Sequence, residues 1–183
     1  TVVRNAVQPS YVNADGVRVT GWQAVIEAAY QNAQLREQEV PLASIPDAVQ
    51  NRLTVDISLE GVTELVIPQA TVLKMQQTQA DYNFYYQGIV LTISADTIAA
   101  CDGDMDLKVF IQRTPDFGAG FDALYLKKRN AAVLDQAVIN VVLSADKAGN
   151  IAYIFGKDAQ SGYQLLYTEQ ISELGTAVIS ADS

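Results

Sequence analysis

Apolar and polar residues alternate along much of this chain, and the alternation predicts its secondary structure. Between residues 53 and 59 every second residue is apolar, which is the period-two pattern of a half-buried strand. Other short apolar-rich segments predict further strands at residues 62–67, 82–86, 89–93, 106–112, 123–127, 138–143, 151–155, 163–168 and 176–179. Gln87-Gly88 lies between two of these segments and is a good two-residue hairpin turn. The chain is therefore expected to be mainly β.

One segment near the N-terminus has the spacing of a helix instead. Apolar residues recur at intervals of three and four between Trp22 and Ala33, and polar residues occupy the opposite side. Pro68 can open a second, short helix at residues 69–77. We expect an α+β fold that is mainly β. It should consist of a twisted antiparallel sheet, β-sandwich-like, with one amphipathic helix of about residues 21–36 packed on it.

The chain is interpreted as a single module of residues 1–183. No low-complexity linker interrupts it, and its length suits either one domain or two small lobes. A division into an α+β lobe of residues 1–100 and a β-rich lobe of residues 101–183 stays open. The best candidate for a boundary is the acidic turn that begins at Cys101.

The composition restricts the chemistry that the chain can perform. Histidine is absent and Cys101 is the single cysteine. Zinc sites built from Cys and His are therefore excluded, and so are Ser-His and Cys-His nucleophilic pairs. The net charge of −9 repels nucleic-acid phosphates and anionic lipid, and no apolar run approaches the ~20 residues that span a bilayer. We expect a protein that is not an enzyme, with no cofactor, no nucleic-acid partner and no membrane insertion.

Several stretches resemble, in order, one known kind of module. Residues 19–25 (VTGWQAV) are similar to a "TGWDAI" opening, and residues 66–73 (VIPQATVL) to "VVPxxVLxxI". Residues 82–92 resemble an aromatic hairpin, without its usual tryptophan, and residues 141–149 resemble "LxxDxKxAG". Residues 151–162 resemble the terminal hairpin. These are features of accessory modules in extracellular multidomain surface proteins of Firmicutes, which often neighbour dockerin or S-layer-homology modules.

This resemblance implies a secreted bacterial module, at the cell surface or in the cell wall, joined to neighbouring modules of a longer chain. It implies no catalytic residue. The expected function is non-catalytic: adhesion, a spacer, or binding of a glycan or a cell-surface protein. Two alternatives stay open. One is a carbohydrate-active hydrolase that uses acidic residues such as Asp56, Glu60 and Glu64. The other is a pilus-like or scaffold subunit that works by strand pairing.

Tyr82, Tyr85 and Tyr86 are the candidate ligand-binding residues. On a strand, Tyr82 and Tyr86 face one side and Tyr85 faces the other, and one of these sides should be core. A tyrosine on the open side offers a ring for stacking on a sugar or a peptide, and its hydroxyl stays available for hydrogen bonds. The alternative is ordinary cross-strand aromatic packing within the sheet.

Asp102, Asp104 and Asp106 form an acidic cluster that is a candidate calcium site. Short loops present oxygens to Ca²⁺ through alternating aspartates. An EF-hand loop beginning at Asp102 would need Gly at its sixth position and Glu at its twelfth, where this chain has Leu107 and Arg113. An EF-hand is therefore excluded. A looser calcium site stays open beside the alternative of a solvated acidic turn.

Overall fold

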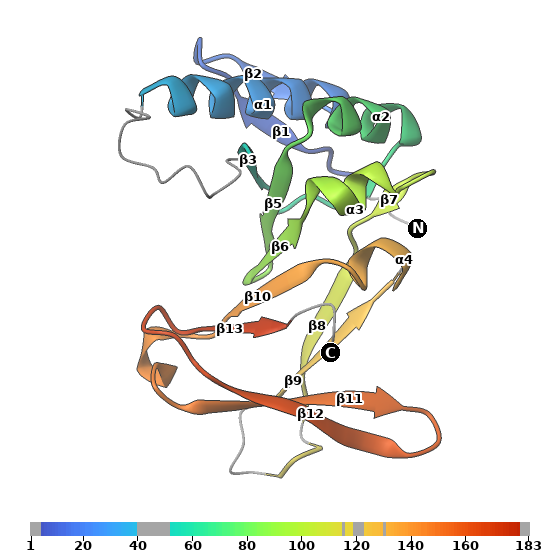
Figure 1. Cartoon of the computed structure of the whole chain (residues 1–183), viewed down its shortest axis with the longest axis vertical. Helices are drawn as coiled ribbons and strands as arrows, with labels where there is room; N and C mark the ends of the chain where they lie inside the picture. The colour runs from blue at the N-terminus through green and yellow to red at the C-terminus, as the bar shows by residue number, and fades with distance from the viewer. Residues whose placement is uncertain (1–4, 40–51, 115, 119–122, 130, 180–183) are drawn as a thin grey trace.

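A five-stranded mixed sheet forms the centre of the fold. The computed structural model of the chain describes residues 5–39, 52–114, 116–118, 123–129 and 131–179 (Figure 1). The strand order is β13-β10-β6-β5-β3, with β3 and β5 parallel and the other neighbours antiparallel. The bounds are β3 Thr54–Ser58, β5 Asp81–Tyr86, β6 Ile89–Ile93, β10 Val138–Val142 and β13 Thr176–Ile179. The expected mainly β, α+β fold is confirmed, whereas the sheet is mixed and not wholly antiparallel.

The parallel pair results from a crossover through α2 (Gln69–Thr78). Parallel neighbours cannot be joined by a tight turn, and the chain runs from β3 through the short strand β4 (Val66–Ile67) and α2 before it enters β5. Pro68 is the N-cap residue of α2, in agreement with the helix expected after it. In contrast, β5 and β6 are joined directly by Gln87-Gly88. Both residues have positive φ, 52° and 75°, which is the requirement of a type I′ turn.

Helices α1 (Trp22–Glu39), α2 and α3 (Ala95–Ala99) pack on one face of the sheet (Figure 1). The first matches the predicted amphipathic helix, and the third was not expected. The ring of Trp22 lies edge-on to Phe84 of β5, with centroids 6.2 Å apart. None of the helices in the described ranges is long and apolar enough to cross a membrane. The buried core residues from sheet and helices include Ile26, Val55, Ile57, Val72, Met75, Phe84, Leu91 and Ile98.

A small hairpin near the N-terminus, β1 (Ser10–Val12) with β2 (Arg18–Thr20), packs against α1. The residues before it are tied to the loop that follows β3. Val7 N donates to Thr63 Oγ1 at 2.7 Å, and Thr63 N donates to the Val7 carbonyl at 3.1 Å. This anchoring places β1 near β3, which is the outermost strand at that end of the sheet.

Two long hairpins from the second half of the chain lie at the other end of the molecule (Figure 1). The ring of Phe117 links them, because it contacts the rings of Phe155 and Tyr163 with centroids 5.0 and 4.9 Å apart. The described residues thus form one larger sheet with separate two-stranded pairings, and not the two facing sheets of a β-sandwich. The remaining elements are β7 Met105–Asp106, β8 Val109–Thr114, β9 Ala123–Lys128, α4 Ala131–Leu134, η2 Ala145–Lys147, β11 Ile151–Asp158 and β12 Gly162–Gln170.

Both halves of the chain contribute to the central sheet. β10 and β13 come from the second half, and β10 pairs directly with β6 of the first half. The boundary expected at Cys101 falls between α3 and β7. Residues 1–100 and 101–183 therefore share one sheet across that point.

Candidate functional site

A row of polar side chains crosses the sheet face opposite to the helices. The period-two alternation puts Asp56, Asn83 and Thr92 on this face, and the strand register places them side by side on β3, β5 and β6. Asn83 Nδ2 donates to Asp56 Oδ1 at 3.0 Å, and Thr92 Oγ1 donates to Asn83 Oδ1 at 2.7 Å. These bonds fix the orientation of the Asn83 amide and the Asp56 carboxylate.

Tyr85 lies beside this row, on the same face of β5 and two residues after Asn83. Its phenol donates to Asp56 Oδ1 at 3.3 Å, and 38% of the residue is exposed. Partial burial raises the pKa of the Tyr85 phenol, and the nearby Asp56 carboxylate raises it further. The phenol is therefore a neutral hydrogen-bond donor at neutral pH, with part of its ring facing solvent.

Arg36 approaches Asp56 from α1. Its Nη1 lies 4.0 Å from Asp56 Oδ2, within ion-pair range but too far for a hydrogen bond, and its side chain is 54% exposed. Asn83 and Tyr85 both donate to the other oxygen, Oδ1. Within the described ranges no donor reaches Oδ2, so this oxygen and the Arg36 guanidinium face each other across a small gap.

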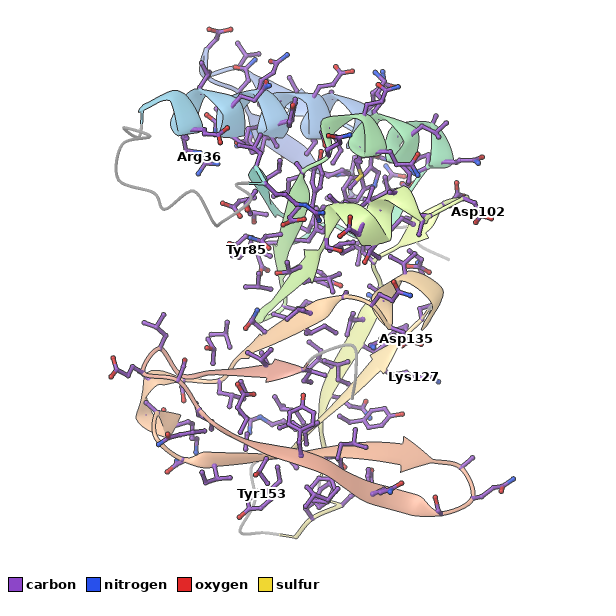
Figure 2. The ribbon with its side chains drawn as sticks, in the orientation of Figure 1. Arg36, Tyr85, Asp102, Lys127, Asp135 and Tyr153 are labelled. Atoms are coloured by element: carbon purple, nitrogen blue, oxygen red, sulfur yellow. The ribbon has the colours of Figure 1, made fainter. Side chains whose placement is uncertain are left out.

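A depression of about 460 Å³ includes this gap. Its walls come from β1, β2, α1, β3 and β5, and Figure 2 shows Arg36 and Tyr85 on the same side of the molecule. In the same lining, the phenol of Tyr11 accepts a hydrogen bond of 2.7 Å from Asn32 Nδ2. The polar residues that line the depression are Ser10, Arg18, Asn32, Arg36, Asp56 and Ser58.

The three candidate tyrosines lie on opposite faces of β5. Tyr82 and Tyr86 point into the core, with 0% and 2% exposure, and burial raises the pKa of Tyr82 to about 12. Tyr82 stacks on Phe84, and the phenol of Tyr86 donates to the Leu107 carbonyl. The expectation that Tyr82 and Tyr86 contact a ligand is thus corrected, because the core-facing side of β5 is closed. Tyr85 lies on the open face and stays a candidate.

The three aspartates of the acidic turn have separate structural roles. Asp104 Oδ1 accepts a hydrogen bond of 2.8 Å from the backbone of Gln69 at the start of α2. Asp106 pairs with Arg129, and the Asp102 carbonyl accepts from the Gln69 side chain. In the part of the chain that the structure describes, no three Asp, Glu, Cys or His side chains are placed to hold a metal. These three carboxylates therefore do not form one such group, and a looser calcium site at Asp102, Asp104 and Asp106 stays a prediction.

The surroundings of Asp106 shift the pKa of its carboxyl group. Burial by itself raises the pKa of its carboxyl group, but hydrogen bonds from Arg129 and from the Lys108 amide outweigh burial and lower it. Asp106 is therefore an anion that joins β7 to the end of β9, a role that holds the fold together.

The acidic residues considered for hydrolysis are also acceptors within the fold. Glu60 accepts from the Gln87 backbone at 3.0 Å, and Glu64 accepts from the Gln8 side chain at 2.6 Å. The general acid of a glycosidase needs a raised pKa. The carboxyl groups with a displaced pKa among the described residues are all displaced downward: Glu27, Asp96, Asp106, Asp116 and Asp146.

Reasoning from the sequence missed the residues that line the depression together with Tyr85. Asn32 was assigned only to the polar face of the predicted helix, Arg36 was not singled out, and Arg18 lies in a hairpin that was not predicted. A signal for that hairpin exists, because Asp15-Gly16 is a strong short-range turn sequence with Tyr11-Val12 before it and the alternating Val17 and Val19 after it.

Comparisons with protein-family models, with curated proteins and with solved structures give no match for this chain. The resemblance to Firmicutes surface modules therefore stays a prediction.

Proposed function

We propose that this chain is a non-catalytic module of an extracellular bacterial surface protein, and that it binds a glycan in the depression beside Tyr85. The location outside the cell is supported by the sequence resemblance. The ligand class is supported by the geometry of the depression and by the residue types that line it.

The observation that carries the proposal is the 4.0 Å separation between Arg36 Nη1 and Asp56 Oδ2. A hydroxyl group accepts and donates at once. A hydroxyl that accepts at about 2.9 Å and donates at about 2.7 Å, roughly at a right angle, places the two protein atoms about 4 Å apart. The gap is therefore polar and close to the size that one bridging hydroxyl occupies.

Tyr85 supplies the second element of a sugar site. A sugar ring presents C–H groups on its faces and hydroxyls around its rim. The exposed ring of Tyr85 can pack against such a face while Arg36 and Asp56 bind the rim. Because Asn83 and Tyr85 hold the Asp56 carboxylate in place, little side-chain entropy is lost when a ligand binds.

Two binding measurements test the site. A glycan array finds the glycans that bind, and affinity electrophoresis in gels that contain the corresponding polysaccharides then measures the affinity. Tyr85→Ala should weaken binding by about ten-fold or more, because an exposed aromatic anchor is lost. Tyr153→Ala is the matched control, since Tyr153 is 57% exposed on β11 and lies outside the depression. Equal affinity of the wild type and Tyr85→Ala contradicts the site, as does an equal loss in both variants.

Asp56→Asn provides an independent check. It keeps the shape of the side chain but removes the charge and one acceptor that faces Arg36. Binding should weaken by about ten-fold, while the circular dichroism spectrum stays that of the wild type. Release of reducing sugar from a bound polysaccharide would overturn the non-catalytic assignment.

A further inference from the structure

We infer that the glycan bound in this depression is anionic, and that its acid group is bound by Arg18, which lines the depression from β2. The inference rests on the proposed glycan site and adds the chemical class of the ligand.

Arg18 donates a hydrogen bond to a neutral side chain of the depression and not to a carboxylate. The chain has 21 acidic and 12 basic residues, so carboxylate partners are abundant. Arg18 nevertheless has no carboxylate partner within the described ranges, and its Nη1 donates to the neutral Ser10 Oγ at 2.8 Å. Among the described residues, cations with carboxylate partners form pairs that include Arg36–Asp56, Arg52–Asp96, Lys74–Glu27, Lys128–Asp135 and Arg129–Asp106.

The lining of the depression carries one more positive than negative charge. Its charged members are Arg18, Arg36 and Asp56. The Asp56 carboxylate is opposed by Arg36 and accepts hydrogen bonds from two neighbours, so its charge is offset locally. The charge of Arg18 has no such counterpart. A molecule with a net charge of −9 thus has a locally positive binding surface.

A guanidinium group with unused N–H donors recognises planar anions best. It binds carboxylate or phosphate through two parallel hydrogen bonds, which a neutral hydroxyl cannot match. The ring of such a sugar would pack on Tyr85, one hydroxyl would lie between Arg36 and Asp56, and the acid group would face Arg18. Carboxylate and sulfate groups on a glycan share this chemistry.

Matched pairs of polysaccharides with and without charge test the inference by affinity electrophoresis. Comparing the affinity for polygalacturonate with that for its fully methyl-esterified form tests recognition of a carboxylate. Comparing dextran sulfate with dextran tests recognition of a sulfate. The charged member of at least one pair should bind about ten-fold more tightly, and the preference should shrink as salt rises. Because the protein is strongly acidic, non-specific attraction of a polyanion is opposed by its own field.

Arg18→Gln should abolish the preference for the charged member, so that both members of the pair bind equally. Lys127→Gln is the matched control, because it removes one positive charge from β9, outside the depression (Figure 2). Arg18→Lys should recover only part of the preference, since it restores charge without the two-pronged geometry.

The outcomes separate the two proposals. Binding of neutral glycans that depends on Tyr85, with no preference for a charged member, overturns the anionic ligand and leaves the glycan site standing. Absence of binding to every glycan of the array overturns both. An unchanged preference in Arg18→Gln, or an equal loss in Lys127→Gln, also overturns the assignment of Arg18.

Discussion

The carboxylate of Glu169 on β12 accepts a hydrogen bond of 2.8 Å from the backbone N–H of Val178 on β13. The phenol of Tyr167 donates to the carbonyl of the same Val178 at 3.0 Å. β13 is the outermost strand at this end of the sheet. The backbone N–H and C=O of Val178 both point away from β10. Side chains from β12 therefore satisfy backbone groups that would otherwise be open to pairing with another strand.

Replacing Glu169 with Ala should destabilise the protein and expose this edge. We expect a loss of about 1–2 kcal/mol in the free energy of unfolding, because a charge-assisted hydrogen bond is removed. Urea unfolding measures the loss, and light scattering measures self-association. Glu169→Gln is the control, since it keeps an acceptor near Val178. The edge-capping role is contradicted if Ala and Gln at this position behave alike.

Tyr86→Phe should be costly although it removes a single oxygen atom. The phenol of Tyr86 donates to the Leu107 carbonyl in the core, and burial raises its pKa so that it stays protonated. Loss of the donor leaves a buried carbonyl without this partner, at a cost of about 1–3 kcal/mol. The comparison is Tyr85→Phe on the same strand, where the phenol is near solvent and the cost should stay below about 1 kcal/mol. Equal unfolding free energies for both variants would argue against this assignment.

Gly175→Ala should be among the most damaging single substitutions. Gly175 has φ of +74°, and a Cβ atom there would overlap the backbone carbonyl of Ser144. We expect a loss of about 3 kcal/mol or more, because left-handed strain and a backbone clash add together. Gly162→Ala isolates the strain, since Gly162 has φ of +78° with open space around it. Its cost should be about 1–2 kcal/mol. Similar melting temperatures for the two variants would refute the clash.

The Asp106–Arg129 pair should give the protein part of its acid sensitivity. The pKa of Asp106 is lowered in the folded state, so the unfolded chain binds the proton more readily. The stabilisation is therefore present above the unfolded pKa of about 4 and is lost as the pH falls through the folded pKa. Its size should be about 1 kcal/mol, because nearly half of the Arg129 side chain is exposed to solvent.

Unfolding free energies of wild type and Asp106→Asn between neutral pH and about pH 2 check this linkage. The wild type should be the more stable at neutral pH, and the two curves should converge in acid. Arg129→Gln should show the same convergence, since it removes the other partner. Parallel curves over the whole range would show that the pair contributes no linkage.

Local patterns predicted most of the strands, though not the β1–β2 hairpin, and the orientation of their side chains. Val55 and Ile57 are buried while Asp56 between them is on the open face, as period two requires. The β5–β6 hairpin was predicted because the two residues Gln87-Gly88 separate two strand-like segments, and both residues do have positive φ. Each of these features depends on a few neighbouring residues, so a single sequence contains enough information to specify it.

Pairing between distant segments could not be predicted in this way. Alternation shows that β3 and β5 are strands but does not show that they are parallel neighbours. The five-residue helix α3 depends on a Ser94 cap, which accepts from Thr97 N at 3.2 Å, and it is too short to produce a periodic signal. The same distinction between local patterns and distant contacts applies to the candidate site. Tyr85 was predicted from its strand, whereas Arg18 and Arg36 reach the depression only through tertiary packing.

The pairing of β6 with β10 sets the order in which this molecule can assemble. Residues 94–137, including the β8–β9 hairpin, separate the two strands in sequence. Closing that loop has an entropic cost that the turn at Gln87-Gly88 avoids. We expect β5 and β6 to join early in the folding nucleus, and β10 with β13 to dock afterwards as the slow kinetic step. Phi values measured for Leu91 and Ile139, which face each other across the β6–β10 junction, would reveal whether this junction forms before or after the rate-limiting barrier.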